Sequence, residues 1–285
     1  MIYYHHDPLD GKALSAELID SLKSEIEALK PKLVVIQVGD NPASASYVRN
    51  KQVACERAGV NFVKIHLNDS TTQNELLAQV EQLNQDDSVT GFIVQLPLPS
   101  HIEVPLIIRA IDPKKDVDGF HAYNLGKMFL SPDFEDLPPA TPLGIVKLLD
   151  HYDIQIQGRE VVVVGHSNHV GKPISTMLLN RNATVTTCHI YTSDLASHTR
   201  RADILIVAVG KPNLITADMV KDGVVVVDVG INRREDGSLC GDVDFENVSK
   251  KASYISPVPG GVGPMTVAAL MVNTVHAAKR MRQNS

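Results

Sequence analysis

Residues 161–173 read Val-Val-Val-Val-Gly-His-Ser-Asn-His-Val-Gly-Lys-Pro, and this stretch decides the fold. The four valines predict a buried strand, because β-branched side chains pack well on a pleated sheet. Gly165 ends the strand, and Pro173 suits the first turn of a following helix. Such a strand, loop and helix direct backbone N–H groups toward a pyrophosphate. Ser167 replaces the second glycine of the dinucleotide-binding fingerprint, which weakens the motif. Taken alone, the motif indicates a strand–turn–helix without a ligand almost as strongly as one that binds a dinucleotide.

The chain around this stretch continues the pattern. We expect further strands at 184–187, 204–209 and 224–227, which predicts a Rossmann-like, doubly wound parallel sheet. Ligands of such sheets bind at the carboxyl ends of the strands. Gly210 and Gly230 follow two of these ends, where a glycine lets the backbone approach a cofactor closely. Their alternative role is to turn the chain.

The strand at 184–187 leads into Cys188-His189-Ile190, where NAD-specific folds carry an acidic residue for the ribose hydroxyls. No acidic residue is present, and its absence permits NADP. His166 and His189 could add positive charge nearby. That both are ordinary loop histidines is an equally supported interpretation.

The first half of the chain predicts a second α/β domain. Strands are expected at 33–38, 62–67 and 91–96, alternating with helices at 14–29, 44–58 and 73–83. Residues 112–142 are rich in Pro, Asp and Gly, which indicates an active-site loop and a linker. Helices are expected at 143–149 and 266–280.

Composition narrows the class of protein. The 285 residues are 44% hydrophobic with a net charge of −6, which fits two globular domains and argues against nucleic-acid binding. Three widely spaced cysteines predict a reducing compartment without a disulfide framework or zinc site. Residues 1–10 resemble neither a signal nor a transit peptide, and no apolar run approaches the roughly 20 residues that span a bilayer. We therefore expect a cytoplasmic protein without a membrane partner.

Several polar residues are candidates for chemistry. Tyr47 and Lys51 are spaced to share a helix face, as a proton-transfer pair would, although such a pair is more often a surface lysine packed on a tyrosine. The same spacing occurs in short-chain dehydrogenases, but there it follows the nucleotide-binding glycines, and here it precedes them. Gln95 ends a strand, where a polar side chain is well placed for a ligand.

Two more segments contain unusual residues. Asp116 and Asp118 share a loop that lacks the ligand density of a calcium site, so we expect no metal there. A single carboxylate that binds an N–H-rich heterocycle is the simpler interpretation, and a solvated turn is the alternative. Residues 257–266 hold three prolines and three glycines before a helix, a composition that a mere turn seldom needs.

Taken together, these motifs resemble the bifunctional methylenetetrahydrofolate dehydrogenase/methenyltetrahydrofolate cyclohydrolase family from end to end. The motifs that carry the resemblance are residues 46–51 (SYVRNK), 95–99 (QLPLP), 115–119 (KDVDG), 228–232 (DVGIN) and 257–266 (PVPGGVGPMT). The resemblance implies an N-terminal folate domain at 1–140, a Rossmann-like NADP domain at 141–263 and a helix at 264–285 that packs back on the first domain. It also implies an active cleft between the domains and a homodimer.

The resemblance also implies site residues. Lys51 would be the central catalytic group, Tyr47 would position it, Gln95 would hydrogen-bond it and Asp118 would anchor the pterin ring. The residues implied in binding folate are Tyr47, Lys51, Gln95, Leu96, Asp118, Pro259, Gly260 and Gly263. Those implied in binding the cofactor are Gly165, His166, Ser167, Ile190, Gly210 and Ile231.

The implied reaction has two steps. 5,10-Methylenetetrahydrofolate is oxidised by NADP to the methenyl compound, which water opens to 10-formyltetrahydrofolate. These steps belong to tetrahydrofolate interconversion, which serves purine, methionine and histidine biosynthesis.

Three residues depart from the family pattern. Many relatives have Arg at position 166 and Ser at position 190, both toward the 2′-phosphate of NADP, and many have Cys at position 140, where this chain has Ala140. A neutral histidine cannot replace the fixed donor fork of an arginine. Three functions therefore stay open: the full NADP enzyme, a cyclohydrolase with weak or NAD-linked dehydrogenase activity, and a non-catalytic folate-binding protein.

Overall fold

The computed structural model describes residues 7–283, which form two compact units. The six-stranded unit comprises residues 7–15 and 141–266, and the three-stranded unit comprises residues 16–140 and 267–283. The expected lack of a targeting signal falls mainly on residues 1–6, outside the described range. The functional domain boundaries near residues 140 and 263 stay a prediction.

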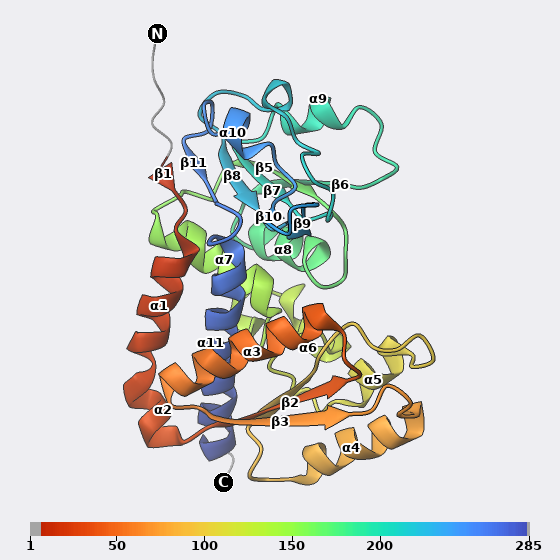
Figure 1. The fold of residues 1–285 in the computed structure, drawn as a ribbon. Helices are drawn as coiled ribbons and strands as arrows, with labels where there is room; N and C mark the ends of the chain where they lie inside the picture. The colour runs from red at the N-terminus through yellow and green to blue at the C-terminus, as the bar shows by residue number, and fades with distance from the viewer. Residues whose placement is uncertain (1–6, 284–285) are drawn as a thin grey trace. The chain divides into compact units, whose positions relative to one another are not determined.

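The six-stranded unit contains a parallel sheet in the order β1-β11-β8-β7-β5-β6 (Figure 1). Its strands are β1 (Asp7–Pro8), β5 (Glu160–Val164), β6 (Thr184–Cys188), β7 (Ile204–Val207), β8 (Val225–Asp228) and β11 (Tyr254–Ile255). A short antiparallel pair, β9 (Asn232–Arg233) and β10 (Leu239–Cys240), follows β8. Its helical segments are α1 (Gly11–Ser21) and α7 (Ala140–His151), which both cross the unit boundary, α8 (Gly171–Leu179), α9 (Leu195–Thr199), η2 (Ala217–Met219) and α10 (Phe245–Val248).

The four valines of β5 are all buried, as the sequence predicts. They pair with β6 on one side and with β7 on the other. The order β6-β5-β7-β8-β11 places the topological switch between β5 and β7, the point where doubly wound sheets bind ligands. The predicted doubly wound α/β fold is therefore confirmed.

The three-stranded unit contains a parallel sheet in the order β3-β2-β4 (Figure 1). Its strands are β2 (Lys32–Val38), β3 (Asn61–Leu67) and β4 (Gly91–Val94). Its helical segments are α2 (Lys23–Leu29), α3 (Pro42–Ala58), α4 (Gln73–Gln85), α5 (Val104–Ala110), α6 (Ala122–Met128), η1 (Pro132–Phe134) and most of α11 (Val262–Gln283). An apolar core joins the sheet to α4 and α5.

Some elements differ from the sequence-based expectation. The predicted helix at 14–29 is divided at Leu22, whose N–H bonds the carbonyl of Ile19 only three residues back. Residues 112–142 are not all loop, because they include α6 and η1, and α5 was not predicted. All three are too short for a sequence periodicity to reveal them.

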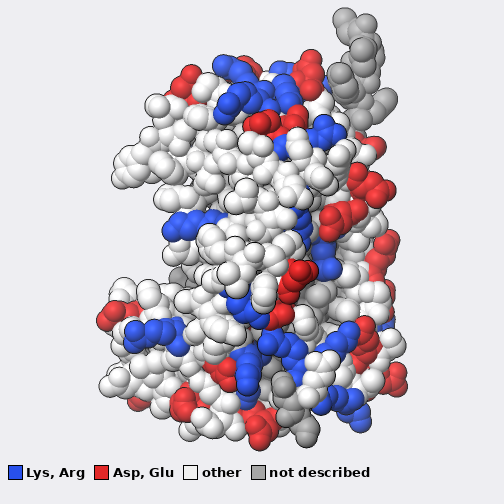
Figure 2. All heavy atoms as spheres, turned by 180° about the vertical axis from the view of Figure 1, so that it is seen from behind, with Lys and Arg blue, Asp and Glu red and all other residues white. Residues whose placement is uncertain are grey.

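Surface charge is mixed on the face shown in Figure 2, where basic and acidic side chains alternate. Among the helices of residues 7–283, none is both long and apolar enough to cross a membrane.

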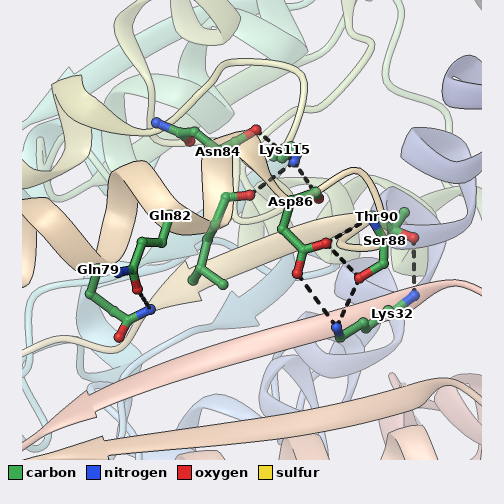
Figure 3. A network of polar contacts seen from close by, with 9 residues as sticks. Lys32, Gln79, Gln82, Asn84, Asp86, Ser88, Thr90 and Lys115 are labelled. Atoms are coloured by element: carbon green, nitrogen blue, oxygen red, sulfur yellow. Dashed lines mark hydrogen bonds and ion pairs between the residues drawn. The ribbon is translucent and has the colours of Figure 1, made fainter.

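A buried ammonium anchors the loop after α5 (Figure 3). Lys115 is 7% exposed, and its Nζ donates to the carbonyls of Leu83, Asn84 and Asp86 at 2.8–2.9 Å. These carbonyls lie at the end of α4, where the helix dipole favours a cation. The backbone carbonyl of Lys115 in turn accepts from the N–H of Phe92 in β4 at 3.0 Å. Lys115 thus ties the loop to both a helix end and the sheet.

We expect Lys115→Met to destabilise the protein by about 3 kcal/mol, because three carbonyls would lose a charged donor. Lys114→Met is the matched control, since Lys114 is exposed and should change stability by less than about 0.5 kcal/mol. Urea unfolding of both variants measures the difference. Equal midpoints for the two variants would contradict this role of Lys115.

Candidate active site

The three-stranded unit places Lys51 against Gln95. Lys51 lies on α3 and is 8% exposed, while Gln95 directly follows β4 and is 9% exposed. The Lys51 Nζ donates to the Gln95 Oε1 at 3.0 Å. The Gln95 amide nitrogen donates to the carbonyl of Leu96 at 2.8 Å, so its oxygen faces the ammonium. The structure thus brings together two residues that lie 44 positions apart in the chain.

The lysine keeps donors for a ligand. An ammonium has three N–H bonds, and among residues 7–283 Gln95 is the acceptor found for it. Tyr47 lies one turn earlier on α3 and is 44% exposed, with its ring available to a ligand. A buried ammonium beside an exposed phenol on one helix is the arrangement that the i, i+4 spacing predicts.

The two loop carboxylates have different environments. Asp116 is 1% exposed and accepts from the backbone N–H groups of Gly119, Phe120 and His121 and from Asn124 Nδ2. Burial raises the pKa of Asp116 against these hydrogen bonds, which lower it. Its carboxylate is therefore committed to shaping the turn. Asp118 is only half-buried, which leaves it as the carboxylate of this loop that a ligand can reach.

The loop is held from two further directions. Asn273 of α11 is buried and its Nδ2 donates to the carbonyls of Val117 and Pro138 at 2.9 and 2.8 Å. On the other side, a side chain at Gly91 would come within 2.3 Å of Val117, so only glycine allows this close packing on β4. Asp118 therefore projects from a fixed loop.

A pocket of the three-stranded unit adjoins these residues. It is lined mostly by apolar side chains, many of them from β4 and α5, and also by Leu96 and both loop carboxylates, but not by Tyr47, Lys51 or Gln95. The lining residues are Phe92, Ile93, Val94, Leu96, Leu98, Val104, Ile107, Ile108, Ile111, Asp116, Asp118 and Phe120.

The six-stranded unit has a close backbone approach at its switch point. Gly165 has φ +124°, and a Cβ there would lie 2.3 Å from the carbonyl oxygen of Ala208 after β7. A Cβ at Gly171, where α8 begins, would lie 2.1 Å from the carbonyl oxygen of Gly165. The two glycines let the end of β5 and the N-terminus of α8 approach closely, an arrangement in which backbone N–H groups of the helix can bind an anion. Ser167 and His166 line the same loop and are exposed.

Two buried carboxylates organise the neighbouring loops, and sequence analysis missed both. Asp242 accepts from the N–H groups of Val209 and Gly210 at 2.7 and 2.9 Å and from Asn232 Nδ2 at 2.8 Å. Asp228 accepts from the N–H groups of Gly230, Asp242 and Val243.

Two glycines make room for these carboxylates. A Cβ at Gly230 would lie 2.2 Å from the Asp242 carboxyl carbon, and one at Gly241 would lie 1.8 Å from an Asp228 oxygen. The N–H of Gly210 is therefore already bonded to protein. Any contact of Gly210 with a cofactor has to use its surface rather than this donor.

The remaining predicted residues lie on three loops. Ile190, after β6, is 86% exposed, and Ile231, after β8, is 43% exposed. A Cβ at Gly263 would lie 3.9 Å from the Ile231 side chain, so these two positions are close together. Gly260 has φ +114°, and its carbonyl accepts from the N–H of Lys12. Pro259 is exposed on the same loop.

Metal-ligating residues are scattered. Within residues 7–283, no group of three or more His, Cys, Asp or Glu side chains is placed to hold a metal ion. All three cysteines are buried and free.

Comparison with known proteins identifies the family. The model of the tetrahydrofolate dehydrogenase/cyclohydrolase catalytic domain matches residues 9–118, and that of the NAD(P)-binding domain matches residues 139–282. The chain therefore belongs to the tetrahydrofolate dehydrogenase/cyclohydrolase family, and the predicted enzyme class is confirmed.

Individual relatives support the same family assignment. The bifunctional protein FolD of Nautilia profundicola is 56% identical over 276 residues, which are 95% of this chain and 96% of that protein. The crystal structure of the bifunctional FolD dehydrogenase/cyclohydrolase of Campylobacter jejuni is 55% identical with a TM-score of 0.93, over 96% of this chain and 99% of that one. The Trypanosoma brucei enzyme, solved with NADP and an inhibitor, is 34% identical with a TM-score of 0.93, over 98% and 99% of the two chains.

Asp228 generates a prediction about pH. Burial raises its pKa to about 6, although three backbone N–H groups oppose the shift. A carboxyl group whose pKa is raised by folding stabilises the protein most below its unfolded pKa, and this contribution is lost as the pH rises through the folded pKa. We therefore expect the stability of the wild type, relative to Asp228→Asn, to fall by roughly 2 kcal/mol between pH 4 and pH 7.

Urea unfolding at several pH values measures this difference. Carboxyl ¹³C NMR of the wild type tests it even if Asp228→Asn does not fold, and the assigned Asp228 carboxyl should titrate near pH 6. Titration of the Asp228 carboxyl near pH 4 or below would contradict the prediction.

Proposed function

We propose that this enzyme oxidises 5,10-methylenetetrahydrofolate with NADP and hydrolyses the methenyl product to 10-formyltetrahydrofolate. The observation that carries the proposal is the buried Lys51–Gln95 contact at the end of β4, within the part matched by the catalytic-domain model. The names of the bifunctional relatives, and the NADP bound to the Trypanosoma brucei enzyme, support both halves of the reaction.

Asp118 is proposed to anchor the pterin ring. A half-buried carboxylate can accept hydrogen bonds from the N–H groups of an aminopyrimidinone, and charge-assisted hydrogen bonds of this kind are strong. Leu96 provides an apolar edge beside it. Asp116, bonded within the protein, keeps the loop in the shape that presents Asp118.

Lys51 is proposed as the central catalytic group, with Tyr47 positioning the substrate over it. Gln95 accepts one lysine N–H, which fixes the direction of Nζ and leaves its other donors for the substrate. As an ammonium, Lys51 can give a proton to the folate nitrogen that departs when the ring opens. As a free amine, it can take a proton from the attacking water.

The dinucleotide site is proposed at the switch point of the six-stranded sheet. Gly165 and Gly171 allow the end of β5 and the start of α8 to approach each other closely, because a Cβ at either position would clash with backbone, and a helix N-terminus in this place can bind a pyrophosphate. NADP, when bound, supplies the hydride acceptor for the methylene carbon. The residues proposed to contact it are Gly165, His166, Ser167, Ile190, Gly210 and Ile231.

The segment of residues 257–266, a loop that leads into the first turn of α11, is proposed to contact folate. Pro259, Gly260 and Gly263 present little side-chain bulk, so the backbone can approach a planar ring closely. The proximity of Gly263 to Ile231 supports a site at which folate and cofactor residues are neighbours within this unit.

The setting of the enzyme is proposed on the family resemblance. We propose a cytoplasmic homodimer that serves tetrahydrofolate interconversion, with its product available to purine, methionine and histidine biosynthesis. Three free cysteines are compatible with a reducing compartment.

A second candidate function is a cyclohydrolase with weak or NAD-linked dehydrogenase activity. His166 and Ile190, in place of arginine and serine, favour it. Separate titrations with NADP and NAD distinguish the two functions, because only the first predicts efficient oxidation with NADP.

We expect Lys51→Ala to slow hydrolysis of methenyltetrahydrofolate by at least about 100-fold, the range of general acid–base catalysis. The loss of absorbance of the methenyl compound measures the rate. Lys64→Ala is the control, because Lys64 is an exposed lysine on β3 of the same unit. Hydrolysis at the wild-type rate by a folded Lys51→Ala protein would show that another group performs this step.

A further inference from the structure

Three polar side chains lie side by side at the carboxyl end of the three-stranded sheet. Gln37 on β2 is opposite His66 on β3, and since Ile36 is opposite Val94, Gln95 is the neighbour of Gln37 on the other side. The Gln95 N–H continues this pairing, because it donates to the Ile36 carbonyl at 2.8 Å. Ile36 and Val94 belong to the apolar core with α4 and α5. Successive side chains of a strand alternate between faces, so the three polar side chains point to the other face.

α3 covers that other face of the sheet. It packs against β2 and β3 (Figure 1), and its Lys51 reaches the side chain of Gln95 at the end of β4. Neighbouring strands lie about 4.8 Å apart, a separation that one bridging water can span. Gln37 belongs to the strand next to Gln95, so its amide lies within reach of the Lys51 ammonium through a single water.

The amide of Gln37 is bonded at one end only. Gln37 is 2% exposed, and its Nε2 donates to the carbonyl of Gly39 at 2.9 Å. A reversed amide would place two oxygens in contact, so this hydrogen bond fixes the orientation of the side chain. The Oε1 atom is buried and has no hydrogen-bond partner within residues 7–283. Because a buried acceptor without a donor is costly, this oxygen marks a place for one.

Lys51 has unused donors beside this unused acceptor. Its ammonium carries three N–H bonds, of which Gln95 accepts one. The other side-chain donors of the row are already engaged. His66 Nε2 lies 3.2 Å from the Gly39 carbonyl, and Gln95 Nε2 donates to the Leu96 carbonyl at 2.8 Å.

A third polar group adjoins the same place. Ser44 is buried on α3, two turns before Lys51 and on the same face of the helix, and its Oγ donates to the Leu96 carbonyl at 3.4 Å. The serine oxygen therefore keeps its acceptor capacity. A buried water needs two to four polar partners. Gln37 Oε1, a Lys51 N–H and Ser44 Oγ supply two acceptors and a donor.

We propose that a water molecule bridges Gln37 Oε1 and Lys51 Nζ, and that Gln37 is thereby a positioning residue for the hydrolysis of the methenyl compound. This role rests on the proposed function, because it takes Lys51 as the group that acts in hydrolysis. With one N–H on Gln95 and a second on the water, tetrahedral geometry fixes the direction of the third. Without Gln37, the ammonium can turn about its contact with Gln95. Gln37 therefore affects turnover more than substrate binding.

A high-resolution crystal structure of the full wild-type chain tests the water directly. We expect an ordered water about 2.7–3.2 Å from both Gln37 Oε1 and Lys51 Nζ. A Gln37 oxygen that accepts from any other donor, or a water that contacts only one of the two atoms, would overturn the bridge. This measurement needs no variant to fold.

Kinetics of the full-length Gln37→Met variant test the positioning role. Methionine keeps the length of the side chain and removes the acceptor, so kcat for hydrolysis of methenyltetrahydrofolate should fall about 5- to 10-fold, with KM changing less than about twofold. His66→Leu is the matched control, because it removes the other side-chain contact of the Gly39 carbonyl and leaves Gln37 in place. It should keep kcat within about twofold of the wild type.

The pattern of the two variants decides between a positioning role and a structural one. Equal losses of kcat in Gln37→Met and His66→Leu would mean that Gln37 acts only through the loop at Gly39. An unchanged kcat in Gln37→Met, or a loss confined to KM, would also contradict positioning. If the wild type hydrolyses no methenyltetrahydrofolate, the proposed function fails and the role of Gln37 fails with it, whereas the crystal structure still decides the bridging water.

Discussion

One hydrogen bond, from Lys51 to Gln95, imposes the strictest constraint on the three-stranded unit. It requires an ammonium to be almost wholly buried next to a neutral partner, which is costly unless a substrate uses the remaining donors. Neighbouring elements of the fold position both side chains for this hydrogen bond. α3 carries the lysine, β4 ends at the glutamine, and the Leu96 carbonyl sets the direction of the amide. The geometry of this site is therefore fixed, because the groups that position Lys51 and Gln95 are themselves parts of the helix, the strand and the loop that follows it.

Buried charge plays the same organising role elsewhere in the chain. Lys115 closes the end of α4, Asp116 shapes the turn before Asp118, and Asp228 and Asp242 hold the loops after β7 and β8. Each of these groups exchanges water for several backbone partners, which lie at the end of α4 for Lys115 and mostly in loops for the carboxylates. The loops that surround the two proposed ligands are thereby held almost as firmly as the strands. This explains how a fold of ordinary strands and helices can present polar groups at fixed positions.

The sequence predicts much of this structure, for identifiable reasons. The valines of β5 and the alternation of strands and helices predict the doubly wound sheet, because burial on both faces produces continuous apolar runs. Family motifs predict Lys51 and Gln95 as partners. The roles of Asp228 and Asp242 were not predictable, because the glycines that admit them resemble ordinary turn glycines until the chain is folded. The difference between Asp116 and Asp118 is likewise a matter of burial, which the sequence of a loop with two acidic residues does not reveal.

The most direct test of the central claim is the pH profile of methenyltetrahydrofolate hydrolysis by Gln95→Glu. A carboxylate in place of the amide holds the proton on Lys51 to higher pH. Whether the lysine acts as base or as acid, the limb of the profile that it controls should move upward by about one pH unit or more. Gln52→Glu, which adds the same charge on the exposed face of α3, should leave the profile in place. An unchanged profile in an active Gln95→Glu enzyme would contradict the pairing of Lys51 with Gln95 as the catalytic core.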